Sequence, residues 1–181
     1  VVEAFNRTGL PLVVIGDGPE RSRLEALARP NVRLLGRLPQ AEVNAWLARC
    51  RAYVYAGLED FGIAPVEAMA AGAPVIGLGQ GGLLDTVRCL RSGDRNPTGW
   101  LFPEQSAACL AEALDTFEAE RLWRRLPAER QRQWAEQFAP EHFQQRIAAV
   151  IEQTWEQHQH RLSVRSRPLP DPLPSRPQPQ P

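Results

Sequence analysis

Short apolar runs alternate with stretches of helical periodicity along the first hundred residues. Runs of three or four apolar residues bounded by glycine or proline predict buried strands, whereas apolar positions spaced three or four apart predict helices that cover a sheet. The expected strands are 12–15, 32–35, 53–55, 74–76 and 100–102. The expected helices between them are 20–28, 40–51, 63–71 and 83–90. This order predicts an α/β fold, a Rossmann-like, doubly wound parallel sheet.

Only helical periodicity remains after residue 104. It predicts helices over 106–117, over 122–138 with a break near Pro127, and over 141–157. After Ser163 the chain is rich in Pro, Arg, Ser and Gln, which predicts a disordered or polyproline II tail. We therefore expect a domain over residues 1–160 with a helical C-terminal extension, followed by a Pro-rich tail over 161–181.

The start of the chain has the pattern of the second half of a helix. Residues 1–8 have helical character, and Gly9 occupies the position of a C-terminal cap. A helix that covers a parallel sheet normally follows a strand. We therefore expect at least one further βα element upstream of residue 1 in the natural fold.

Composition and charge exclude several function classes. The 21 cations, all of them arginine, balance 21 anions, so the net charge lacks the basic excess of a general nucleic-acid binder. No run reaches the roughly 18 apolar residues of a transmembrane segment. The three cysteines are odd in number and form no C-x-x-C pair, so neither a disulfide framework nor a metal site is predicted, and a cytoplasmic location is expected.

Two carboxylates flank a predicted helix start. Glu59 lies in the loop after strand 53–55, and Glu67 lies on the helix that Gly62 opens. In open α/β sheets, ligands bind at the carboxyl ends of strands, where helix N-termini present free N–H groups. The amides around Gly62 could hold a phosphate, and the carboxylates could accept hydrogen bonds from hydroxyls on either side of it. Taken alone, however, two such glutamates are most often solvated surface residues.

Four segments in one order carry a family resemblance. Residues 1–160 resemble the C-terminal domain of retaining, GT-B-fold glycosyltransferases of family 4, the group 1 glycosyl transferases, and most closely a mannosyltransferase-like subgroup. The segments are VIGDGPE at 14–20, LGRL at 35–38, the E-x7-E block at 59–76, and Gly81-Gly82 with TGWLF at 98–102.

The resemblance implies roles for individual residues. Glu59 is the expected catalytic-site residue and contacts the hydroxyls of the transferred sugar, while Glu67 binds the ribose. The donor-binding set comprises Glu59, Phe61, Gly62, Ile63 and Glu67. The nucleotide-binding set comprises Gly16, Gly36, Arg37, Leu38 and Glu67.

The resemblance also implies a reaction and partners. The chain would be the donor-binding half of an enzyme that transfers a sugar, mannose in the subgroup, from a GDP- or UDP-sugar to an acceptor hydroxyl in polysaccharide or glycoconjugate synthesis. No metal or other cofactor is implied. The acceptor-binding N-terminal domain and the basic pair that grips the diphosphate would lie upstream, so the chain alone is expected to be inactive. Peripheral membrane association of the intact enzyme stays open. Two alternatives remain: a non-catalytic nucleotide-sugar-binding module and a GT-B nucleotide-sugar epimerase.

Overall fold

The computed structural model describes the backbone of residues 1–165 and the side chains of residues 1–161. Most of the tail expected over 161–181 therefore lies outside the described residues. The chain divides into two compact units, Val1–Phe138 and Ala139–Pro181.

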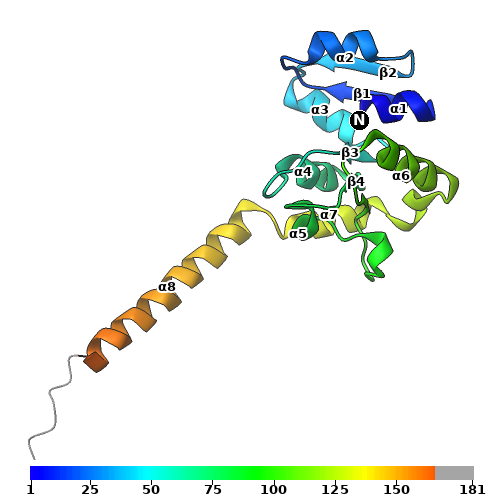
Figure 1. The fold of residues 1–181 in the computed structure, drawn as a ribbon. Coiled ribbons are helices and arrows are strands. Elements are labelled where there is room, and N and C mark those ends of the chain that lie inside the picture. Colours follow the sequence, from blue (N-terminus) through cyan, green and yellow to red (C-terminus); the bar gives the residue numbers. More distant parts are fainter. Residues whose placement is uncertain (166–181) are drawn as a thin grey trace, which may run out of the picture. The chain divides into compact units, whose positions relative to one another are not determined.

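The first unit contains five strands, and every strand pair is parallel (Figure 1). They are β1 (Leu12–Ile15), β2 (Val32–Gly36), β3 (Tyr53–Tyr55), β4 (Val75–Leu78) and β5 (Gly99–Phe102). All four residues of β4 are buried, which explains why its sequence is a continuous apolar run rather than an alternating one. The predicted α/β class with parallel strands is confirmed.

The strands form two sheets rather than one continuous sheet. β1 pairs with β2, and β4 lies between β3 and β5. Within the described residues no hydrogen-bonded ladder joins β1 to β3. Because the strands in each sheet are parallel, their carboxyl ends lie at one edge of that sheet. The loops that follow the strands at this edge are available for a ligand site.

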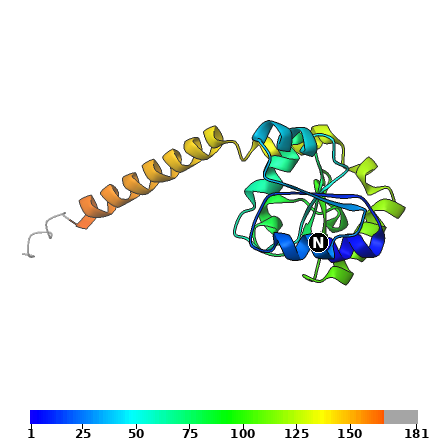
Figure 2. The same ribbon diagram turned by 90° about the horizontal axis from the view of Figure 1, so that it is seen from above.

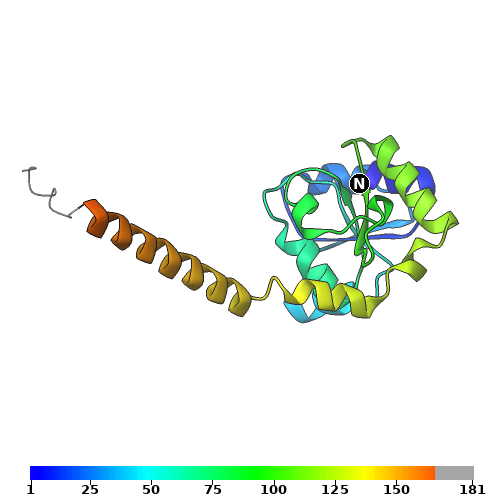
Figure 3. The same cartoon turned by 90° about the horizontal axis from the view of Figure 1, so that it is seen from below.

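Helices lie on both sides of the strands (Figures 2 and 3). α1 packs on α6, and α4 packs on α7. The bounds are α1 (Val2–Thr8), α2 (Arg21–Leu27), α3 (Gln40–Leu47), α4 (Ile63–Ala71), α5 (Leu83–Thr86), α6 (Ala107–Ala119) and α7 (Ala128–Glu136), with 3-10 turns η1 (Leu90–Ser92) and η2 (Leu122–Arg125).

Glycine ends two of these helices as the sequence predicts. Gly9 after α1 and Gly72 after α4 both adopt left-handed backbone conformations, with φ of 70° and 99°. Such values favour glycine because a Cβ atom would be strained there. At the start of α6, the Ser106 side chain accepts a hydrogen bond from the Cys109 N–H at 3.1 Å. These caps fix where the chain turns between layers.

Two predicted helices are shorter than expected. The helix expected over 83–90 is wrong in its second half, because α5 ends at Thr86 and the next residues pair with the segment before β5. The Arg88 N–H donates to the Thr98 hydroxyl, and the Thr98 N–H donates to the Arg88 carbonyl. The helix expected over 40–51 ends at Leu47, because the chain must reverse before β3 begins at Tyr53.

Two apolar clusters stabilise the first unit. The larger lies around α6 and the strands and includes Ile76, Phe102 and Phe117, each at most 2% exposed. The smaller joins Met69 of α4 to Leu83 and to Ala135 of α7. Gln131 of α7 is fully buried, and neither its Nε2 nor its Oε1 atom has a hydrogen-bond partner. Such an unsatisfied group costs about 1–3 kcal/mol of stability.

In the second unit the structure describes the helix α8 (Pro140–Arg165), which is longer than the expected 141–157. The expected boundary at residue 160 falls inside this helix, since residues 141–165 contain no proline that would interrupt it. α8 carries a row of exposed apolar side chains at intervals of four residues, namely Phe143, Ile147, Ile151 and Trp155. Within residues 1–165, no helix is both long and apolar enough to cross a membrane.

Candidate functional site

The loop that carries Glu59 is held against the glycine pair at the start of α5. The Gly82 N–H donates a hydrogen bond to the Glu59 carbonyl at 2.8 Å. A Cβ atom added at Gly82 would lie 2.5 Å from the Asp60 carbonyl, and one added at Gly81 would lie 2.6 Å from the Glu59 carbonyl oxygen. Both positions therefore require glycine for close backbone approach. This contact fixes the backbone on which the Glu59 side chain stands.

Gly62 turns the same loop into α4. Its φ of 88° is left-handed, and it precedes the first residue of the helix, Ile63. No side chain caps this helix start. The first N–H groups of an α-helix lack partners within the helix, and the helix dipole makes this end electropositive. Phe61 and Ile63 are exposed, whereas Gly62 is buried. The start of α4 can thus accept a negatively charged group.

Glu59 and Glu67 act on one tyrosine. The pKa of Tyr53 is raised to about 12, first by burial and then by the negative charges of Glu59 and Glu67. A nearby negative charge disfavours the ionised form of a phenol. Glu59 and Glu67 therefore both act electrostatically on Tyr53, although one is on the loop and the other on α4. Glu59 is half-buried and Glu67 is exposed.

Tyr55 is the last residue of β3. Its ring stacks with that of Tyr53, with centroids 6.5 Å apart and planes 12° from parallel. The pKa of Tyr55 is raised to about 12, first by burial, then by a side-chain hydrogen bond to Glu59 and by the charge of Glu59. The sequence reasoning did not single out either tyrosine, although both lie within six residues of Glu59.

An aromatic cluster borders the loop. The Phe61 ring meets the Phe138 ring edge-on at 5.6 Å, and Phe138 meets Trp134 in the same way at 5.9 Å. The Trp134 Nε1 donates to the Thr86 carbonyl at 2.7 Å, and the Arg88 guanidinium lies 3.5 Å from the Trp134 ring centre. The spacing of Trp134 and Phe138, four residues apart on a helical pattern, is the signal that could have placed both on one face.

The predicted nucleotide-binding residues form a second group. The Gly16 N–H donates to the Gly36 carbonyl at 2.8 Å, which joins the ends of β1 and β2. Gly36 has φ of 72°, and an added Cβ atom there would lie 2.6 Å from the Arg21 guanidinium. Arg37 is exposed and Leu38 is half-buried. The structure thus gathers the predicted residues at two places, the β1–β2 ends and the loop after β3.

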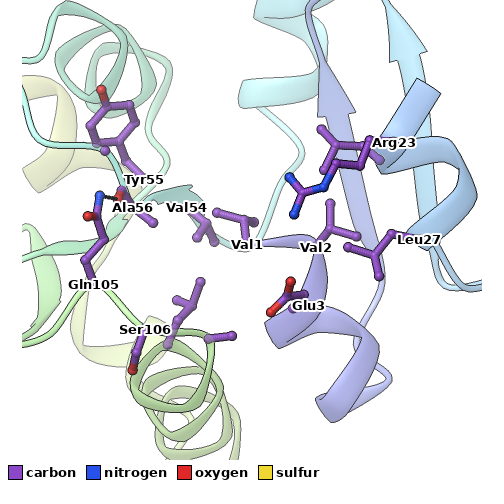
Figure 4. Close-up of a pocket in the computed structure, with 14 residues that line it drawn as sticks. Val1, Val2, Glu3, Arg23, Leu27, Val54, Tyr55, Ala56, Gln105 and Ser106 are labelled. Atoms are coloured by element: carbon purple, nitrogen blue, oxygen red, sulfur yellow. Dashed lines mark hydrogen bonds between the residues drawn. The ribbon is translucent and has the colours of Figure 1, made fainter. Parts of the chain in front are cut away.

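A cavity of about 540 Å³ opens beside the end of β3 (Figure 4). It is lined by the start of α1, by α2, by residues 54–57 and by the start of α6. The Gln105 side chain donates to the Ala56 carbonyl at 2.8 Å across its wall. Neither Glu59 nor Glu67 lines this cavity, so its volume gives no measure of the acidic site. No group of three or more His, Cys, Asp or Glu side chains able to hold a metal ion occurs in the described part of the chain.

The sequence matches a known family over most of its length. The family model described as "Glycosyl transferases group 1" matches residues 1–139. This chain belongs to the group 1 glycosyltransferases. Its GT-B-like, Rossmann-type parallel architecture is therefore that of a glycosyltransferase domain, and the predicted family is confirmed.

Curated relatives include mannosyltransferases. The chain is 37% identical over 107 residues to a phosphatidyl-myo-inositol mannosyltransferase of Propionibacterium freudenreichii, in a match that covers 58% of this chain and 26% of that protein. It is 36% identical over 120 residues to the protein of the same name from Mycobacterium leprae, covering 63% of this chain and 29% of the relative. The chain thus spans less than a third of these relatives.

Solved structures share the fold. HepE of Anabaena, determined in complex with UDP, superposes with a TM-score of 0.67 at 22% identity, over 84% of this chain and 44% of that protein. Sucrose-phosphate synthase of Thermosynechococcus elongatus gives a TM-score of 0.64 at 23% identity, over 86% of this chain and 49% of the other. The shared region again accounts for less than half of each larger protein.

Proposed function

We propose that this group 1 glycosyltransferase chain forms the donor-binding half of a retaining enzyme that uses a GDP- or UDP-sugar. The observation that supports the proposal is the pair of carboxylates around an uncapped helix start, Glu59 in the loop before α4 and Glu67 on α4 itself. The similarity to HepE, solved with UDP, and to mannosyltransferases supports a nucleotide donor and a hexose such as mannose.

The diphosphate would rest on the N-terminal end of α4. Free N–H groups of Phe61, Gly62 and Ile63 would donate to phosphate oxygens, and the helix dipole would favour their charge. Glu59 and Glu67 would repel the phosphates but accept hydrogen bonds from hydroxyls. Glu59 would then bind the sugar and Glu67 the ribose, each through charge-assisted bonds of about 1.5–3 kcal/mol.

The nucleobase would lie at the ends of β1 and β2. The Gly16–Gly36 hydrogen bond brings these ends together, and neither glycine carries a side chain that would block an approaching ring. Arg37 and Leu38 would border the base. Because the chain contains no lysine, the helix dipole and arginines would have to balance the diphosphate within it.

The complete reaction needs more than this chain supplies. Transfer to an acceptor hydroxyl with retention at the anomeric carbon, in the cytoplasm and without a metal, is the proposal for the intact enzyme. An acceptor-binding N-terminal domain would supply the opposite wall of the cleft. The leaving diphosphate gains negative charge as the sugar bond breaks, so a clamp of basic groups would contribute several kcal/mol to the transition state.

Isothermal titration calorimetry tests the donor site. The wild-type chain is titrated separately with UDP-glucose and GDP-mannose, and we expect a measurable heat with at least one of them. Glu67→Ala removes the proposed ribose acceptor and should weaken binding about tenfold or more. Glu112→Ala, on the exposed side of α6, is the matched control and should leave the affinity unchanged. Absence of heat with both donors, or equal weakening by the two variants, would refute the site.

A further inference from the structure

The strand β1 has one edge without a partner. Among the strands of residues 1–165, it pairs only with β2. The N–H groups of Leu12 and Gly16 donate to carbonyls at either end of β2. Successive N–H groups point to opposite sides of a strand, so those of Val13 and Ile15 point away from β2. This second edge of β1 is open.

The strand β3 has an open edge of the same kind. Its ladder within the described residues is with β4, and the Tyr53 N–H donates to the Pro74 carbonyl just before β4. By the same alternation, the backbone groups of Val54 and Ala56 point away from β4. The Ala56 carbonyl on this side accepts a hydrogen bond from the Gln105 side chain at 2.8 Å.

Both open edges border one apolar region. The cavity of about 540 Å³ has Val54 and Ala56 on one side and Leu27 of α2 on the other, and most of the side chains that line it are apolar (Figure 4). Leu12 and Val14 of β1 pack on the same apolar cluster as Val54 and Ala56 of the β3 segment. The two unpaired edges and the cavity therefore belong to one core.

The burial of the strands distinguishes these edges from the centre of a sheet. β4, which has a partner on each side, is buried throughout, whereas every residue of β1 and β3 is half-buried. Parallel strands are normally buried on both faces. An open row of N–H and C=O groups is a template for a further strand. Here two such rows border the same core.

We propose that the strand predicted upstream of Val1 lies in this cavity and pairs with β1 on one side and with β3 on the other. It is extended, apolar and parallel to both. The two sheets then become one, in the order β2, β1, upstream strand, β3, β4, β5. The first residues of α1 line the cavity beside the end of β3, so a strand that ends there leads directly into α1. The path from this strand through α1 to β1 is then the usual crossover between parallel neighbours.

The added strand bears on the candidate site without depending on the proposed function. From the upstream strand to β2 the chain proceeds in one direction across the sheet, and from β3 to β5 it proceeds in the other. Open α/β sheets bind ligands where this direction reverses, outside the carboxyl ends of the strands. The loop after β3, which carries Glu59, lies at this point. The upstream strand therefore ends beside that loop.

Amide hydrogen exchange followed by nuclear magnetic resonance tests the pairing. The chain of residues 1–181 is compared with the same chain extended by its natural upstream sequence through one predicted strand. In the shorter chain the N–H groups of Val13, Ile15 and Val54 should exchange about a hundredfold faster than those of Val14 and Tyr55, which point toward β2 and β4. In the extended chain the two sets should agree within about tenfold.

Two results of this exchange experiment would overturn the proposal. One is a difference between the two sets of amides that persists in the extended chain. The other is equal protection already in the 1–181 chain together with a dimeric mass, which would mean that a second copy covers the edges.

Filling the cavity with a side chain tests the location. Ala107 lines the cavity and is half-buried, whereas the next residue, Ala108, is exposed and serves as the matched control. In the 1–181 chain, Ala107→Phe and Ala108→Phe should each melt within roughly 2 °C of the parent. In the extended chain, Ala107→Phe should lower the melting temperature by about 3–10 °C, because the strand occupies the same space, and Ala108→Phe should not. An equal effect of Ala107→Phe in both chains would overturn the location.

Discussion

Gly82 gives the sharpest test of how the acidic loop is supported. Its φ of −61° is helical, so alanine is not strained there by its own backbone. The added methyl carbon would instead lie 2.5 Å from the Asp60 carbonyl. Ordinary carbon contacts are near 3.5 Å, so the segment that carries Glu59 would have to move by about 1 Å. The hydrogen bond from Gly82 to the Glu59 carbonyl would be distorted as a result.

The expected cost has two parts. Overpacking of this kind lowers the free energy of unfolding by about 1–3 kcal/mol. For a domain of this size that corresponds to a fall in melting temperature of roughly 3–10 °C. A displacement of about 1 Å at a binding group can also lower its effectiveness on the order of a hundredfold, so donor binding should fall below detection.

Thermal unfolding followed by circular dichroism and donor titration by calorimetry measure both parts. Gly79→Ala is the matched control, because it lies in the same loop and its added Cβ would come no closer than 3.4 Å to any neighbour. If Gly82→Ala melts within about 1 °C of Gly79→Ala and binds donor equally well, the reasoning on close backbone approach is refuted.

Three further predictions concern stability. The pKa values of Tyr53 and Tyr55 are about 12 in the folded protein, whereas an unfolded tyrosine ionises near pH 10. The stability that these two phenols contribute should therefore be fully present below pH 10 and be lost as the pH rises toward 12. Urea unfolding at pH 9 and pH 11 should show this loss of unfolding free energy, and Tyr53→Phe should roughly halve the loss. Trp134→Phe removes the N–H that donates to the Thr86 carbonyl and the indole ring that the Arg88 guanidinium contacts. The free energy of unfolding in urea should fall by about 2 kcal/mol. The control Trp46→Phe on α3 should lower it by less than half of that amount. Gln131→Met replaces two unsatisfied buried polar atoms with an apolar side chain of similar length and should raise the unfolding free energy by about 1 kcal/mol; a decrease would mean that these atoms are satisfied by bound water.

The sequence predicted the elements of the first unit well because their signals are local. Gly9 and Gly72 end helices through their own backbone preference, and the apolar run of β4 reports its burial directly. The prediction of a helix over the second half of 83–90 was wrong, because Arg88 instead hydrogen-bonds to Thr98, ten residues further along the chain. Local helix propensity carries no information about such a distant partner. The division into two sheets likewise depends on pairing between distant strands.

The candidate site shows the same limit. The spacing of Glu59, Gly62 and Glu67 indicated a ligand site because each residue type has a chemical reason to stand there. The contribution of Gly82 to holding the loop was missed, since it depends on which segments fold against the loop. Its role became clear only when the space around its α-carbon was known. Whether the predicted residues bind a donor stays a prediction for the titrations above.

The exposed row on α8 has a practical consequence for handling the protein. Every buried residue of both apolar clusters lies before Phe138, so a shortened chain ending there keeps its whole interior. It would lose the exposed apolar side chains Phe143, Ile147, Ile151 and Trp155. Such side chains promote association between molecules at the concentrations used for spectroscopy. Such a chain would suit nuclear magnetic resonance studies, in which resonances of Glu59 and its neighbours could be followed one by one as sugar nucleotides are added.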